Sequence, residues 1–160
     1  MPVILGIDPG LNTTGYGVLD SVGRRIKLLE GGIIRSRSKE LAEKIKEIHD
    51  GLCEVIAVFK PKELALEELY SHYARPTTAI LMGHARGVIC LAAAQNGITV
   101  HSYAATQVKK ILTGHGHASK DQMQRAIQLE LALSQYPDPP DVADALAIAL
   151  CHAHLRKSGE

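Results

Sequence analysis

The sequence has few cysteines, and no two of them lie close together. Cys53, Cys90 and Cys151 are an odd number of widely spaced thiols without a CxxC motif. Secreted disulfide frameworks use even numbers of cysteines, and zinc or redox sites use closely spaced pairs. We therefore expect all three to be small core residues of a protein from a reduced compartment, with the cytoplasm as its default location.

The sequence also lacks a recognisable membrane or export segment. No unbroken apolar run approaches the roughly 20 residues that a membrane helix needs. The N-terminus, MPVILGID, has no basic region before its apolar stretch and reaches a carboxylate at Asp8. Signal peptides have the opposite pattern. We expect no membrane partner.

Net charge is almost absent. Eighteen lysines and arginines face 17 aspartates and glutamates, which gives a formal charge of +1. A nucleic-acid-binding face would have to arise from local clustering of basic residues, with the acids gathered elsewhere. The 160 residues, 46% of them hydrophobic and 22% charged, have the size and composition of one globular domain.

Hydrophobic periodicity predicts an alternation of strands and helices. Strands are expected over residues 2–8, 15–22, 25–35, 63–69 and 98–103, and helices over residues 39–59, 76–95, 105–113, 119–133 and 141–155. Proline or glycine ends several of these elements, as at Asp8-Pro9-Gly10 and Asn96-Gly97, and Ser119-x-x-Gln122 is a capping box. Three strands in a meander followed by α/β alternation predict a mixed five-stranded sheet with helices on both faces.

Four acidic residues lie at or near the ends of predicted strands and at the start of the last predicted helix. Asp8 ends the first strand, Glu67 or Glu68 lies near the end of the fourth, and the carboxyl ends of neighbouring parallel strands meet at one edge. Asp141 and Asp144 are three apart at the start of the last helix, so they share a face. Clustered carboxylates favour hard cations such as Mg²⁺ or Mn²⁺ over zinc. Two such ions can promote phosphodiester hydrolysis.

Each acid taken alone has a simpler explanation. Asp8 before Pro-Gly is typical turn chemistry, Asp141 could be an N-cap, and Glu67 and Glu68 could end a strand that turns to solvent. Asp144 is harder to explain in this way, because it lies between two alanines in an apolar helix, where an unpaired carboxylate is costly. Alternation alone does not choose between Glu67 and Glu68.

Five segments carry an ordered set of motifs that runs through nearly the whole chain. They are residues 6–10 (GIDPG) with 14–18 (TGYGV), 65–67 (ALE), 83–87 (GHARG), 103–109 (YAATQVK) and 141–147 (DVADALA). Their order and spacing resemble the RuvC family of Holliday junction resolvases. The resemblance implies a ribonuclease H-like fold. It also implies that Asp8, Glu67, Asp141 and Asp144 are the catalytic, metal-binding carboxylates, and so selects Glu67 over Glu68.

The same resemblance implies an activity and its partners. A member of this family would be a homodimer that resolves four-way DNA junctions by paired symmetric nicks, in recombination and repair, together with the RuvA–RuvB branch-migration complex. Each active site would use two Mg²⁺ ions, with Mn²⁺ as a substitute. Lys109 and Lys120 would lie near the scissile phosphate. Tyr70 would stack on a base, as a tyrosine where the family usually has phenylalanine.

The helix over residues 76–95 is the expected dimer surface. It combines large apolar residues with small ones that allow a second helix to approach closely, namely Ile80, Leu81, Gly83, Ala85, Gly87, Val88 and Leu91. One apolar stripe can cover the sheet while another remains for a partner. The alternative is that all of these residues belong to the core of their own chain.

Other interpretations remain open at this point. The chain could be a ribonuclease H-like nuclease with another substrate or a silent junction-binding module, although a phosphate-binding face gains nothing from four acids. Sugar kinases and actin-type ATPases share an Asp-x-Gly loop but need a second domain. Two histidine pairs, His115-x-His117 and His152-x-His154, are expected not to be metal ligands. An H-x-H pair alone is a weak signal, and in the last helix residues two apart point to different sides.

Overall fold

The computed structural model describes residues 2–23, 25–68 and 75–158. Its strands are β1 Val3–Asp8, β2 Thr13–Asp20, β3 Lys27–Arg35, β4 Glu63–Glu67 and β5 Thr99–Tyr103. Its helices are α1 Leu41–Phe59, α2 Pro76–Gln95, α3 Ala105–Thr113, α4 Lys120–Glu130 and α5 Pro140–Ser158. The elements occur in the expected order, and they differ from the predicted bounds only at their ends.

The five strands form one mixed sheet in the order β3-β2-β1-β4-β5. The first three strands pair antiparallel as a meander, while β1, β4 and β5 run parallel. In the parallel pair of β1 and β4, Ile7 lies opposite Leu66. The residues that follow them, Asp8 and Glu67, therefore stand side by side at the carboxyl edge of the sheet.

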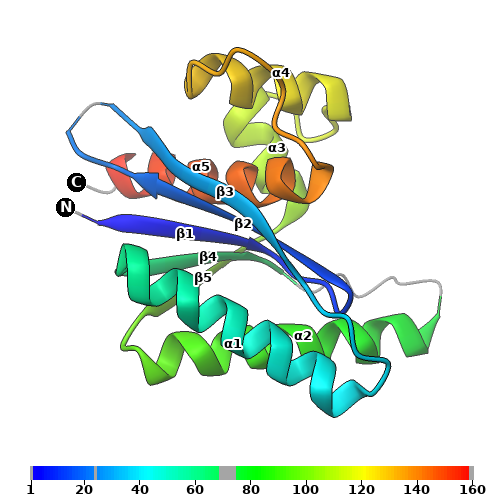
Figure 1. Cartoon of the computed structure of the whole chain (residues 1–160). Helices are drawn as coiled ribbons and strands as arrows, with labels where there is room; N and C mark the ends of the chain where they lie inside the picture. The colour runs from blue at the N-terminus through cyan, green and yellow to red at the C-terminus, as the bar shows by residue number, and fades with distance from the viewer. Residues whose placement is uncertain (1, 24, 69–74, 159–160) are drawn as a thin grey trace.

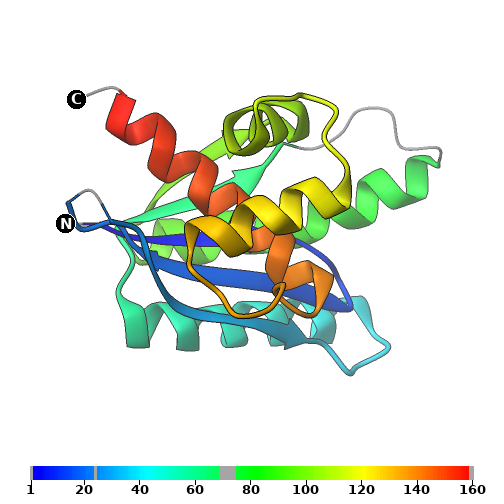
Figure 2. The same cartoon turned by 90° about the horizontal axis from the view of Figure 1, so that it is seen from above.

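Helices cover both faces of the sheet, as Figures 1 and 2 show: α1 and α2 lie on one side, and α5 lies on the other with α3 and α4 outside it. Alternation along β4 separates two hydrophobic cores. Leu64 and Leu66 pack in the core beneath α1 and α2, whereas Ala65 packs against α5. Side chains two residues apart on a strand point to the same face of the sheet. Glu63 and Glu67 therefore face α5, as Ala65 does, from the two ends of β4.

Glycines in the first two strands let α5 lie close to the sheet. A side chain at Gly6 would collide with the carbonyl of Ala145, and one at Gly15 would collide with the backbone of Asp141. The glycines of the GIDPG and TGYGV motifs thus bring the first turns of α5 against β1 and β2. This contact carries Asp141 and Asp144 toward the end of β1.

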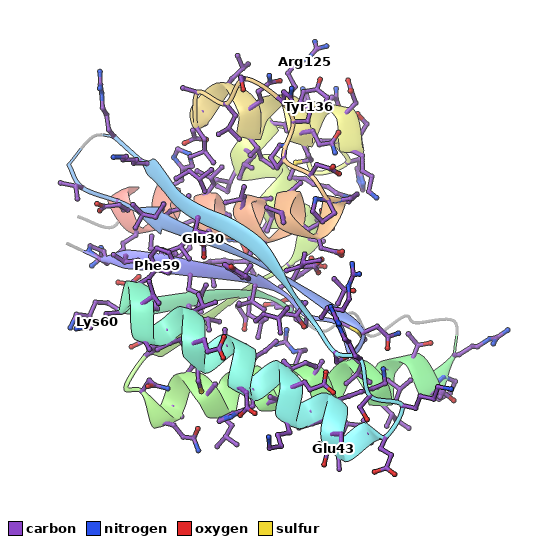
Figure 3. All side chains as sticks on the ribbon, in the orientation of Figure 1. Glu30, Glu43, Phe59, Lys60, Arg125 and Tyr136 are labelled. Atoms are coloured by element: carbon purple, nitrogen blue, oxygen red, sulfur yellow. The ribbon has the colours of Figure 1, made fainter. Side chains whose placement is uncertain are left out.

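Polar contacts fix α4 and its following loop on the outside of α5. Ser119 and Gln122 form the expected capping box at the start of α4. Arg125 and Tyr136 lie together at the outer edge of the molecule (Figure 3), and a hydrogen bond from Arg125 to Tyr136 raises the pKa of the arginine. Glu130, at the end of α4, forms an ion pair with His154 of α5.

One sequence expectation needs correction. Only Cys151 is buried in the core, whereas Cys53 is half-buried and Cys90 is exposed on α2. Helix α2 is also long and apolar enough, by length and composition alone, to cross a membrane. Its alanines and large aliphatic residues give it a high mean hydropathy, although the polar residues His84 and Arg86 interrupt the apolar run. Ile80 and Leu91 lie on its exposed side.

Candidate active site

The four predicted carboxylates converge at the carboxyl edge of the sheet. Asp8 ends β1, Glu67 ends β4, and Asp141 and Asp144 lie in the first turns of α5. Asp8 interacts electrostatically with each of the other three, and its carboxyl group shares a hydrogen bond with that of Asp141. Asp8 and Asp141 are half-buried, whereas Glu67 and Asp144 are more exposed but still lose part of their surrounding water in the folded protein.

The environment of Asp8 strongly favours its protonated form. Burial and the negative charges of Asp144, Asp141 and Glu67 together raise the pKa of Asp8 from 3.8 to about 8. A hydrogen bond between two carboxyl groups requires a proton on one of them, which agrees with this direction. The protein therefore holds negative charges together at a cost that a proton or a cation can relieve.

Basic side chains face the acids from three other helices. Loss of surrounding water and the charge of Asp144 raise the pKa of Glu67, while Lys109 of α3 and Arg86 of α2 oppose that rise. Loss of water also raises the pKa of Asp144, and Lys120 of α4 opposes it. Basic residues thus cluster at this edge of the sheet as expected, but the acids lie among them and are not gathered elsewhere.

A pocket of about 200 Å³ joins the acids to the two predicted lysines. Glu67 and Asp144 line it together with Lys109 and Lys120. Its deeper wall is apolar and comes from α3, α4 and α5, with Val108, Met123, Ile127, Ala147 and Ile148. An anionic group in this pocket would lie among both lysines and two of the carboxylates.

Two residues that support the site had no role in the sequence interpretation. The guanidinium of Arg86 donates a hydrogen bond to the carbonyl of Glu67, which fixes the end of β4. The buried hydroxyl of Thr14 donates to the carbonyl of Gly10 at 2.7 Å and accepts from the amide of Gly10 at 3.3 Å. Both residues lie inside recognised motifs, GHARG and TGYGV, so their position in those motifs was the available signal.

The remaining predicted residues have different outcomes. Tyr70 lies outside the described residues, so its stacking role stays a prediction. His115 and His117 are both exposed in the loop after α3. His152 and His154 separate as helical spacing predicts: His154 pairs with Glu130, and His152 contacts Glu63.

Residues 4–152 match the family model described as crossover junction endodeoxyribonuclease RuvC. The chain belongs to the RuvC family. A RuvC from Rhodopirellula baltica is 58% identical over 153 residues, which cover 95% of this chain and 86% of the relative. A RuvC from Marinobacter nauticus is 44% identical and covers 99% of this chain and 89% of its own length.

Solved structures agree with this assignment. Thermus thermophilus RuvC in complex with a Holliday junction substrate is 37% identical and has a TM-score of 0.93, with 99% of this chain and 97% of that chain covered. The yeast mitochondrial Holliday junction resolvase, at 12% identity and a TM-score of 0.68, shares the fold over 96% of this chain and 80% of its own. The fold is thus the ribonuclease H-like fold of RuvC resolvases, and the chain is a crossover junction endodeoxyribonuclease.

Proposed function

We propose that this RuvC-family nuclease resolves four-way DNA junctions by paired symmetric nicks, with Asp8, Glu67, Asp141 and Asp144 as the catalytic carboxylates. The observation that carries this proposal is the convergence of the four acids, two of which, Glu67 and Asp144, line a pocket together with Lys109 and Lys120. A surface that only bound DNA would gain nothing from acids placed among its phosphate contacts.

The donor set fits two hard divalent cations. Nucleases of this family are metal-dependent, and all four candidate ligands are carboxylates, which suit Mg²⁺ or Mn²⁺. The raised pKa of Asp8 indicates that the acids need a positive charge between them before all can ionise. When bound, Mg²⁺ supplies a Lewis acid that activates the attacking water and stabilises the leaving oxygen. We take two ions per site as the working stoichiometry.

The protein's own residues then hold and orient the DNA. Lys109 and Lys120 neutralise phosphate charge at the mouth of the pocket, and Arg86 keeps the end of β4 in place through the carbonyl of Glu67. Thr14 does the same for the turn after Asp8. A stacking role for Tyr70 would hold a base of the opened junction beside the site, because its ring offers the necessary π-face.

A homodimer would supply the second active site that paired nicks require. One face of α2 is exposed and carries Ile80, His84, Gly87 and Leu91 at spacings of three and four residues. The exposed fractions of Ile80 and Leu91 are 62% and 52%. Small residues on this face allow close approach of a second helix. Ala85, in contrast, is fully buried in its own chain, so it is not part of the dimer surface.

The wider setting of the enzyme follows from its family. We place residues 1–160 in one nuclease domain that acts in the cytoplasm in recombination and DNA repair. The RuvA–RuvB complex is the proposed partner that brings junctions to it.

A labelled synthetic four-way junction tests the proposal directly. We expect paired nicks with Mg²⁺ and none with a chelator. Asp8→Asn, Glu67→Gln, Asp141→Asn and Asp144→Asn should each abolish or cripple nicking but retain junction binding, because removing negative charge does not hinder phosphate approach. Glu68→Gln is the matched control and should cleave normally. Wild-type cleavage by any one of the four variants would show that its acid is misassigned, and binding without nicking by the wild type would favour a silent binding module.

A further inference from the structure

A second group of possible metal ligands lies at the opposite end of β4 from the active site. Glu63 begins β4, His101 lies in the middle of β5, and His152 lies on the buried side of α5. One ligand atom from each of these residues lies within 4.8 Å of the other two. We propose that Glu63, His101 and His152 bind one transition-metal ion, of which Zn²⁺ is the biological candidate.

The donor set distinguishes this site from the carboxylate cluster. Two imidazoles and one carboxylate suit Zn²⁺, Co²⁺ or Ni²⁺ and not Mg²⁺, and Zn²⁺ with this set keeps a fourth position for water. Ligand atoms must come to about 2.0–2.2 Å from a common ion. The three side chains already converge, so small rotations are sufficient to reach that geometry.

The contacts of His152 match the usual support of a metal-binding histidine. Its Nε2 faces Glu63, and its Nδ1 contacts the hydroxyl of Tyr103. In the metal-free protein, Tyr103 donates to Nδ1 and the Nε2–H donates to Glu63. With an ion on Nε2, the proton moves to Nδ1 and the donor becomes Nδ1–H, with the tyrosine oxygen as acceptor. A ligating histidine typically uses its second nitrogen in this way.

The other two ligands are available to an ion. The ring of His101 lies 4.4 Å from that of His152, centroid to centroid, and within the described residues its nitrogens have no hydrogen bond. Arg156 contacts only one carboxylate oxygen of Glu63, Oε1, at 2.9 Å, so Oε2 remains on the side of the histidines. The Arg156 side chain is 36% exposed, and Glu63 and His101 are half-buried, so the group lies near the surface of the molecule.

An ion at this position would join β4, β5 and the last turns of α5. The hydrogen-bonded chain from Tyr103 through His152 and Glu63 to Arg156 already links these elements. Among the described residues that chain leaves the nitrogens of His101 without a hydrogen bond, and a metal would use one of them. The expected consequence is a raised melting temperature without any direct contact with the catalytic carboxylates.

Titration of the full chain with Co²⁺ tests the site. The protein is stripped with a chelator and kept in excess Mg²⁺, which occupies the carboxylate cluster. We expect one Co²⁺ per chain, a visible absorption spectrum of four- or five-coordinate Co²⁺, displacement by Zn²⁺ and a higher melting temperature with Zn²⁺. Absence of any such binding would overturn the proposal.

Variants assign the ligands. His101→Gln, at a half-buried position, should lower Co²⁺ affinity by more than the roughly 10–100-fold that loss of an outer partner costs, and Tyr103→Phe should lower it by about that amount. The double variant His115→Gln/His117→Gln is the control, because this exposed pair is the other histidine source of affinity, and it should bind Co²⁺ normally. The assignment would be overturned if the control lost Co²⁺ binding while His101→Gln kept it. X-ray absorption of the Zn²⁺ complex of His115→Gln/His117→Gln then gives the ligand set without that pair: two imidazole ligands support the site, and none refutes it.

Discussion

Asp8 is the residue whose chemistry depends most on its surroundings. In the unfolded chain it is an ordinary carboxylate, but in the folded protein it is half-buried among three other acids, which raise its pKa to about 8. The same group therefore connects folding, protonation and metal binding. Its neighbour in the sheet, Glu67, has a raised pKa for the same two reasons, loss of water and the charge of Asp144.

The stability of the metal-free protein should fall as pH rises from about 4 toward 8. Because the pKa of Asp8 moves from 3.8 to about 8 on folding, the folded state binds more protons than the unfolded state between these values. The free energy of unfolding therefore decreases with rising pH. Chemical unfolding in chelator at several pH values measures this slope. Asp8→Asn should flatten this pH dependence and stabilise the protein at pH 8, and added Mg²⁺ should do the same. An unchanged slope in Asp8→Asn would show that another group causes the pH dependence.

Lys109 and Lys120 should each contribute about one phosphate contact. Lys109→Ala or Lys120→Ala is expected to weaken junction binding and to reduce the slope of log K against log salt by about 0.9, since each contact releases bound counterions. Binding measured over a series of salt concentrations gives the slope. Lys110 is the matched control, because it is exposed on the same helix but does not line the pocket. Equal slopes for all three variants would show that Lys109 and Lys120 are ordinary surface lysines without a specific phosphate contact.

Among the elements, α5 is the one that assembles the site. It contributes two of the four acids at its first turns, and it also covers one face of the sheet along β1, β2 and β4. Its position depends on small residues of the strands beneath it. The catalytic geometry is thus set by backbone contact between α5 and glycines that carry no functional group of their own.

Gly15→Ala should damage both stability and cleavage. The added methyl group would collide with the backbone of Asp141, so α5 must shift, at an overpacking cost of about 1–3 kcal/mol in the free energy of unfolding. Nicking should fall more than junction binding does. Gly116→Ala, where a Cβ would come no closer than 3.7 Å to the carbonyl oxygen of Thr106, is the control and should leave stability and cleavage near their wild-type values. Denaturant unfolding and the junction assay provide the two measurements, and wild-type cleavage by Gly15→Ala would refute the packing argument.

At the scale of the whole molecule, the exposed face of α2 is the feature that one chain alone does not explain. Core residues of α2, such as Ala85 and Ile89, pack inside the chain, yet the opposite face is also apolar. A membrane span and a helix–helix interface have the same composition. The proposed junction chemistry, with two equivalent strands to cut, favours the interface.

Ile80→Glu should convert a dimer into a folded monomer. A charge in the middle of an apolar interface is costly, whereas at a 62% exposed position it should not unfold the chain. We expect weak junction binding and few or no paired nicks. Val58→Glu, at a 72% exposed site on α1, is the matched control and should remain dimeric and active. Sedimentation and the junction assay check the outcome; a wild-type protein that is monomeric at working concentration yet makes paired nicks would contradict the proposal.

The sequence by itself determined the elements and the candidate acids, because both depend on local rules. Apolar runs, alternation and helical spacing predicted every described strand and helix, and proline, glycine and the Ser119 capping box placed most of their ends. Motif order selected Glu67 over Glu68. The end of α4 was less predictable, because the chain leaves the helix through Ala132, which has a φ of 53°, without a glycine to mark it.

Only the tertiary structure decided which distant residues meet. The contact between Gly15 and α5, the bond from Arg86 to Glu67 and the grouping of Glu63 with His101 and His152 join residues far apart in the chain. The spacing of His152 and His154 predicted that the two would not share a metal, and their side chains do point to different partners. Spacing along the helix does not indicate which residues of β4 and β5 lie near His152. Periodicity reports which face a residue occupies, whereas strand order and helix packing determine what lies across from it.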